Sequence, residues 1–134
     1  MEIENFADLL RAARAQPEPQ RLLFVFAQAE LPEDATPAQR ADFEAGQGGA
    51  LVPVVSVDKA PDDLAGFDTL VEESRVHAPD WAVVFVAGLS GSGGRAPAGA
   101  EAGRALERMI EAVKGGQFGA FLAFDRRGEP VLFD

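Results

Sequence analysis

The residues best placed for chemistry lie in a glycine-rich stretch at 88–95, which has the sequence Gly-Leu-Ser-Gly-Ser-Gly-Gly-Arg. An apolar run at 81–87 precedes it and predicts a buried strand, and a helix is predicted after it, at roughly 100–114. Glycine-rich loops between a strand and a helix present backbone N–H groups to anions and let a phosphate come close. The predicted contacts for a small anionic or phosphorylated ligand are Gly91, Ser92, Gly93, Gly94, Arg95 and Arg104.

The motif departs from the known phosphate-binding patterns. Gly88 to Gly93 has the glycine spacing of a P-loop, but Gly94 and Arg95 stand where Lys and Ser/Thr should follow. The order is not G-x-G-x-x-G either, and no acidic residue ends the preceding strand to hold Mg²⁺. Two other interpretations therefore stay open, a mobile surface connection and a loop that orders on a protein partner. We expect no cofactor.

No other residues form a coherent catalytic set. His77 is the only histidine, so a multi-histidine metal site is excluded, and no serine near it has a nucleophile-elbow context. We expect His77 to be an exposed turn residue; the alternative is a base paired with Asp80 or Glu73. Adjacent acids such as Asp62-Asp63 diverge by about 100° on a helix and favour a solvated surface. The sequence thus predicts no catalytic residue and no metal ligand.

Composition narrows the class of protein. The 134 residues suffice for one domain with its own core, and the absence of cysteine excludes disulfides, thiolate catalysis and Cys-ligated metals. No apolar run is long enough to span a bilayer and the N-terminus lacks a signal pattern, so we expect a cytoplasmic protein without a membrane partner. The net charge of −10 disfavours binding to nucleic acid. Residues 1–94 carry all of that net charge, because acids and bases balance in residues 95–134.

Helical and strand patterns alternate along the chain. Helices are predicted at 5–15, from Thr36 to near Gly46, from Pro61 onward and at roughly 100–114; strands are predicted at 21–27, 50–57, 81–87, 118–124 and 130–133. Asn5 is a predicted N-cap, Thr36 and Gln39 a capping box with Phe43 inward, and Gly66 a weak point that divides its helix into two pieces. The 125–129 loop predicts a hairpin, with Gly128 at positive φ.

The element order predicts an α/β fold. It favours right-handed βαβ crossovers and a single layered domain over residues 1–134. We expect a mixed four- to five-stranded sheet, helices packed on it and a C-terminal β-hairpin. The continuous apolar run at 21–27 favours a central strand, and Pro53 favours an edge or bulged position for the strand at 50–57.

Several phrases resemble one known family. They are residues 17–26 (PEPQRLLFVF), 30–36 (ELPEDAT), 49–53 (GALVP), 57–61 (VDKAP), 93–97 (GGRAP) and 121–125 (FLAFD). Together they resemble small bacterial proteins catalogued as "ribonucleotide reductase subunit alpha". That activity needs a radical-forming cysteine and a reducing cysteine pair, and this chain has no cysteine. The catalogue name therefore does not describe the chemistry of this chain, and no catalytic residue can be transferred to it. The resemblance leaves an accessory role beside a reductase as the only connection to that enzyme.

Two functions remain from the sequence. The first is a non-enzymatic protein that binds another protein, or itself as a homodimer through a sheet edge. The second is a binder of, or an enzyme acting on, a small anionic ligand at 88–95. We favour the first, because no catalytic set is present.

Overall fold

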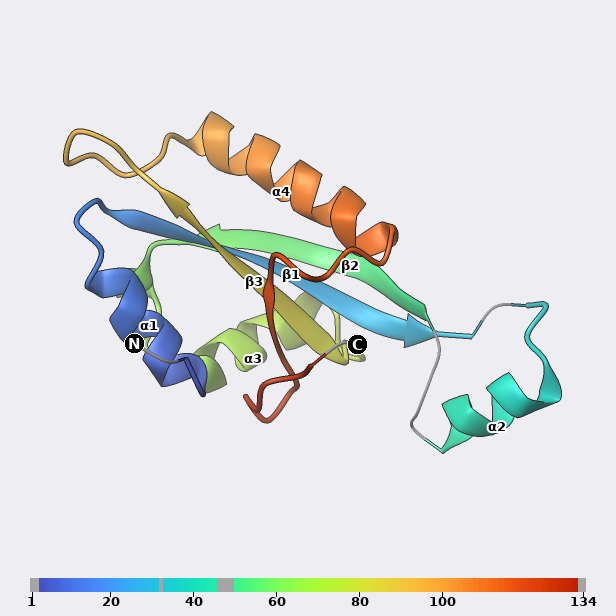
Figure 1. Cartoon of the computed structure of the whole chain (residues 1–134). Helices are drawn as coiled ribbons and strands as arrows, with labels where there is room; N and C mark the ends of the chain where they lie inside the picture. The colour runs from blue at the N-terminus through green and yellow to red at the C-terminus, as the bar shows by residue number, and fades with distance from the viewer. Residues whose placement is uncertain (1–2, 32, 46–49, 133–134) are drawn as a thin grey trace.

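A computed structural model describes residues 3–31, 33–45 and 50–132 of the chain (Figure 1). Its helices are α1 (Phe6–Arg14), α2 (Pro37–Glu44), the 3₁₀ turn η1 (Pro61–Asp63), α3 (Phe67–His77) and α4 (Gly99–Lys114). Its strands are β1 (Gln20–Glu30), β2 (Ala50–Lys59), β3 (Val83–Ser90) and β4 (Leu122–Phe124). The predicted α/β class is confirmed, as a single small domain around one four-stranded sheet.

The strand order is β2-β1-β3-β4, and each neighbouring pair is antiparallel. β1 is central, as its continuous apolar run predicts, and β2 is an edge strand, as Pro53 predicts. The register between β1 and β2 shifts between Phe26 and Ala27, which pair with Val55 and Pro53. Val54 is therefore the extra residue of a β-bulge, a position where a neighbouring proline is tolerated.

Helices cover both faces of this sheet (Figure 1). α1 and α3 pack on one face, where Phe6, Leu70 and Trp81 meet the even-numbered β1 side chains such as Phe24. α4 crosses β1 and β2 on the other face, where its apolar stripe meets odd-numbered side chains such as Val25. Successive residues of a strand point to opposite faces, so covering both faces requires an unbroken apolar run in β1.

The predicted mixed sheet is wrong in one respect, because no neighbouring strands in the described residues are parallel. β2 and β3 do run in the same direction and are joined through α3, but β1 lies between them. β1 and β2 are adjacent and antiparallel, so they are connected as a hairpin with a long loop and not by a crossover. α2, which this loop contains, lies away from the sheet and buries no side chain, so the expectation that Phe43 points inward is also wrong (Figure 1).

The local signals at helix ends are confirmed. The Asn5 side chain accepts a hydrogen bond from the Asp8 N–H at 2.9 Å. Thr36 and Gln39 form a reciprocal capping box, with distances of 3.1 and 2.8 Å. The segment around Gly66 divides into η1 and α3, as the weak point there predicts.

The C-terminal hairpin is present but shorter than predicted. Gly128 has φ 83°, and the Asp125 N–H donates to the Glu129 carbonyl at 2.9 Å. β4 contains only the last three residues of the predicted strand at 118–124, and the return strand is reduced to a bridge between Phe124 and Pro130.

Candidate functional site

The glycine-rich loop is a tight turn at the end of a strand. β3 continues through Ser90, and Ser92 and Arg95 then form an antiparallel bridge around Gly93 and Gly94. Those two glycines have φ of 59° and 77°, the left-handed geometry that a type I′ turn requires at both central positions. The glycine pattern is therefore explained by the conformation of the turn.

Backbone N–H groups of this turn already have partners within the protein. The Gly91 N–H donates to the Pro19 carbonyl at 2.9 Å, and the Arg95 N–H donates to the Ser92 carbonyl at 3.0 Å. The Gly94 N–H donates to Glu18 Oε2 at 2.8 Å. A carboxylate of the protein itself thus occupies the place that the anion hypothesis gives to a ligand, and a second anion there would meet a like charge.

Arg104, one of the two arginines of the anion hypothesis, lines a different part of the surface from these donors. Arg104 is exposed on α4 and lines a hollow of about 530 Å³ with Glu107, Arg108 and Glu111, to which none of Gly91, Ser92, Gly93, Gly94 and Arg95 contributes. In open parallel α/β sheets ligands bind beyond the carboxyl ends of the strands, but neighbouring strands of this sheet are antiparallel, so the fold gives no such reason to expect a ligand at the loop. The anion site remains a prediction from the sequence, and this geometry adds no support to it.

A better-formed candidate lies along the outer edge of β2. β2 ends the sheet, so the main-chain groups on its outer side have no strand beside them in the described part of the chain. The seven residues from Leu51 to Val57 carry no charge. Unpaired strand edges are sites where proteins add a strand from another chain.

An apolar groove of about 600 Å³ separates this edge from α3. Its lining residues come from β1, β2 and α3: Phe26, Val55, Ser56, Val57, Leu70, Glu73, Ser74, Val76 and His77. Phe26 and Leu70 are buried in this lining, whereas Val76 is 77% exposed. Val54, the bulge residue of β2, does not line the groove but is 39% exposed on the same strand. Both the groove and the edge strand therefore present an apolar residue to solvent.

Two polar groups of the groove, Glu73 and Ser74, have structural partners. Lys59 Nζ lies 2.5 Å from Glu73 Oε2 and joins β2 to α3. The Ser74 hydroxyl donates to the Val71 carbonyl at 2.7 Å and accepts from Trp81 Nε1, also at 2.7 Å. Because its proton is directed at a backbone carbonyl, Ser74 is not arranged as a nucleophile for His77, which is the last residue of α3.

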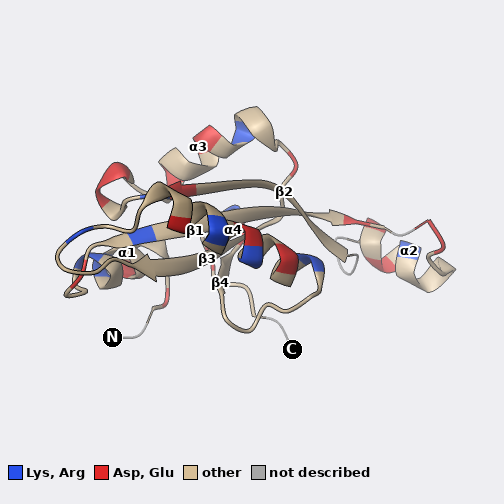
Figure 2. Ribbon diagram, turned by 90° about the horizontal axis from the view of Figure 1, so that it is seen from above, with Lys and Arg blue, Asp and Glu red and all other residues tan. Residues whose placement is uncertain are grey.

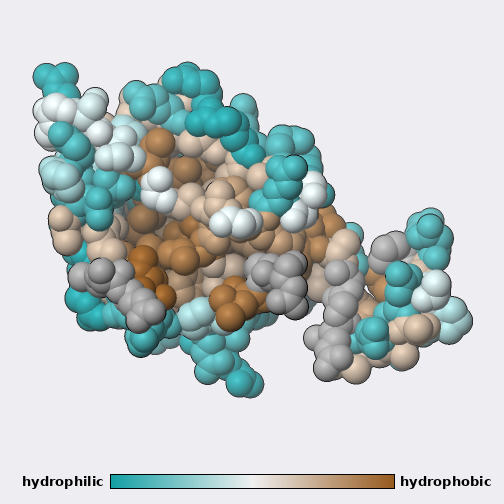
Figure 3. Space-filling model, viewed as in Figure 1, coloured by the Kyte–Doolittle hydropathy of each residue, from teal (hydrophilic) through white to brown (hydrophobic). Residues whose placement is uncertain are grey.

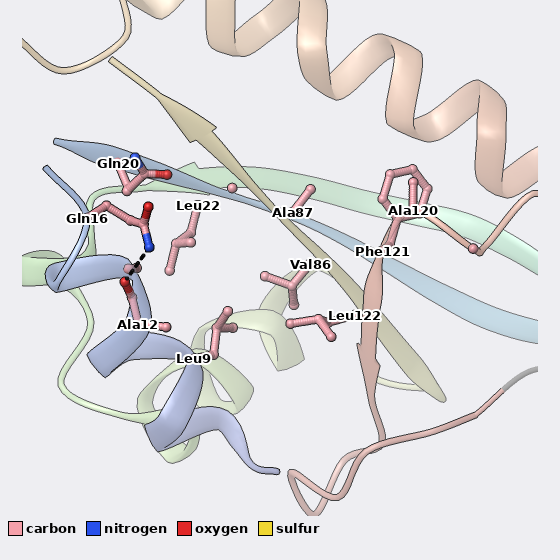
Figure 4. Close-up of a pocket in the computed structure, with 13 residues that line it drawn as sticks. Leu9, Ala12, Gln16, Gln20, Leu22, Val86, Ala87, Ala120, Phe121 and Leu122 are labelled. Carbon is pink, nitrogen blue, oxygen red and sulfur yellow. Dashed lines mark hydrogen bonds between the residues drawn. The ribbon is translucent and has the colours of Figure 1, made fainter. Parts of the chain in front are cut away.

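A second hollow, of about 400 Å³, lies at the other edge of the sheet (Figure 4). It lies between α1, the end of β3 and the segment 119–122. Apolar residues gather on the surface in this region, between α1, α4 and β4 (Figure 3). β4 pairs only with Val84, Phe85 and Val86, so residues 87–90 have no strand on this side among the described residues. This free edge spans residues 87–90, less than half the ten residues of β2.

Comparisons with known proteins add no assignment: no family model matches the chain, and neither a curated protein nor a solved structure matches it. Across the described residues, no cluster of three or more His, Asp or Glu side chains is placed to hold a metal ion. No helix in that part of the chain has the length and apolar character needed to cross a membrane. The β2 edge and its groove are therefore the features from which a function can be inferred.

Sequence reasoning reached this edge through Pro53 but missed the groove beside it. The groove depends on where α3 lies relative to β2, which no local pattern encodes. One signal was available: an uncharged segment at 46–57 lies between two strongly acidic ones.

Proposed function

We propose that this protein is a non-enzymatic binding module that takes up an extended segment of a partner protein along the outer edge of β2. The observation that carries the proposal is that a ten-residue edge strand, which has no neighbouring strand on its outer side in the described residues, lies beside an apolar groove. Strand addition of this kind derives affinity from main-chain hydrogen bonds and specificity from pockets for alternate side chains.

The groove suits the side chains of an added strand. Side chains of a β-strand alternate between two faces, so every second residue of the partner would point toward α3. There it would meet Val55, Val57 and Leu70, and the exposed Val76 would cover it from the rim. Burying apolar surface stabilises such a complex by roughly 25 cal/mol per Å² before the cost of ordering is subtracted.

Selection from a random 12-residue peptide display library on the immobilised protein tests this proposal. The blocking variants are Val54→Lys, which places a charge on the edge as natural edge strands do, and Val76→Lys on the rim of the groove. The matched controls are Val54→Thr, which keeps β-branching, and Leu132→Lys at the far edge, where the side chain is 91% exposed. All three of the substituted residues are solvent-accessible, so each variant should fold.

We expect enriched peptides to bind the wild type and both controls with similar Kd, and to bind each blocking variant at least ten-fold more weakly. Multi-angle light scattering on the same proteins shows whether a second copy is the partner, as a dimer that Val54→Lys dissociates. The proposal fails if the protein is monomeric and no peptide is enriched, or if the blocking variants bind as well as the controls.

A further inference from the structure

The negative charge of the chain is concentrated around the β2 edge (Figure 2). Residues 30–45, which include α2, contain five acids and one arginine, and residues 58–80, which include η1 and α3, contain seven acids and two basic residues. The uncharged residues 46–57 lie between them. These two segments therefore carry a net charge of −9, out of −10 for the whole chain.

Several of these acids lie at the two ends of β2. At its first residue, Glu30 of β1 pairs with Ala50, and Glu33 and Asp34 follow in exposed positions. At its other end, Asp62 and Asp63 of η1 are both exposed, and the Asp62 side chain is 93% accessible. The apolar middle of the edge thus has an acidic region at each end.

Only part of this charge is neutralised by neighbours. Asp58 pairs with Arg21 and Glu73 pairs with Lys59, so those two carboxylates serve the fold. The exposed Glu72 has Arg75 3.4 Å away on the same helix, an exposed pair of the weakly held kind. The exposed Asp62 has Arg14 Nε 3.5 Å away, another exposed pair of this kind. The other acids of the two segments are exposed to solvent, where they are available to a cation on a partner.

We infer that the partner of β2 is a basic segment of another protein: an apolar strand of about seven residues with Lys or Arg on both flanks. This inference rests on the proposed function and adds the identity of the occupant. The length follows from the seven uncharged residues between Leu51 and Val57. The basic flanks follow from charge complementarity, which steers association and rejects wrong partners.

The same charges argue against a second copy of this chain. Two β2 strands paired about a two-fold axis run antiparallel, so the Ala50 end of one lies beside the Lys59 end of the other. Each acidic region would then face the acidic region of the second copy. At physiological ionic strength charges are screened beyond about 8 Å, so groups brought this close would still repel.

A second peptide library tests the inference directly. Each peptide has seven randomised central residues, and two positions on each flank are drawn from Lys or Glu in equal proportion. Selection on the wild-type protein in 50 mM NaCl should enrich Lys over Glu more than ten-fold at both flanks. Equal use of Lys and Glu among binders, or a preference for Glu, overturns the inference while leaving strand binding at β2 intact.

Two charge variants distinguish attraction of the peptide by the acids near β2 from attraction by the net charge of the protein. The flank variant carries Asp34→Asn, Asp42→Asn, Asp63→Asn and Glu72→Gln; the remote variant carries Glu101→Gln, Glu107→Gln, Glu111→Gln and Glu129→Gln. All eight side chains are exposed, and both variants change the net charge by the same amount. The best Lys-flanked peptide should bind the flank variant at least ten-fold more weakly than the wild type, and the remote variant within about two-fold.

The outcomes distinguish this inference from the proposed function. Equal weakening in both variants means that the peptide responds to overall charge, and the inference fails. A dimer that Val54→Lys dissociates also overturns it, because the second copy is then the partner, although the β2 edge keeps its role. Absence of any enriched peptide from a monomeric protein removes the proposed function, and this inference with it.

Discussion

Gly91 is held where a side chain has no room. A Cβ atom added there would lie 1.8 Å from the Arg95 carbonyl oxygen, which belongs to the backbone and cannot rotate away. We expect Gly91→Ala to lower the free energy of unfolding by about 1–3 kcal/mol, the usual cost of overpacking. Urea denaturation followed by circular dichroism measures this change, and faster hydrogen exchange at Gly94 and Arg95 would locate it in the turn.

The control for this change is Gly103→Ala in the middle of α4. A Cβ atom there meets nothing within 4 Å, so the substitution adds helix propensity without a clash. It should stabilise the protein by about 1 kcal/mol. If Gly91→Ala were also neutral or stabilising, the turn would have to differ from the one described.

The buried hydrogen bond between Trp81 and Ser74 offers a second test at the residue scale. Trp81 is 1% exposed, and its indole N–H donates to the Ser74 hydroxyl. Ser74→Ala leaves that donor without a partner and should cost about 1–3 kcal/mol in unfolding free energy. In a Trp81→Phe background no donor is orphaned, so the same substitution should cost clearly less. Equal costs in the two backgrounds, measured as a double-mutant cycle, would contradict this role.

At the scale of elements, local signals predicted well wherever a local cause decides the structure. The capping box at Thr36, the division near Gly66 and the turn at Gly128 each depend on a few adjacent residues, and the structure confirms them. The apolar run in β1 correctly predicted burial on both faces. The same run could not tell parallel from antiparallel neighbours, because covering both faces of an antiparallel sheet with helices demands the same pattern.

The antiparallel pairing of β1 and β2 follows from where α2 lies. Alternation of strands and helices predicted a crossover at every helix, but a helix makes a crossover only when it packs back on the sheet. α2 buries no side chain and does not pack on the sheet. The segment that contains it therefore leads the chain back to the side of β1, where β2 pairs with β1 in the antiparallel direction. For the candidate site, Pro53 indicated the edge, whereas the groove depends on contacts between β2 and α3 that are distant in sequence.

At the scale of the whole molecule, the clustered negative charge should oppose folding. Net charge far from zero destabilises a compact state through self-repulsion, and salt relieves it. Raising NaCl from 20 to 500 mM should therefore stabilise the wild type by about 1 kcal/mol, a rise in Tm of about 3–5 °C for a chain of this size. Differential scanning calorimetry on the wild type and the two charge variants measures this rise.

The position of the charges then decides how the variants differ. Acids near β2 outnumber basic residues, whereas those on α4 alternate with Arg104 and Arg108. The flank variant removes repulsion, so its Tm should rise with salt by half the wild-type amount or less. The remote variant removes acids that attract neighbouring arginines, so its Tm should keep most of the wild-type salt dependence. Equal salt dependence in the two variants would mean that the total charge governs stability. The acidic regions around β2 would then have no local effect on stability beyond their contribution to the net charge.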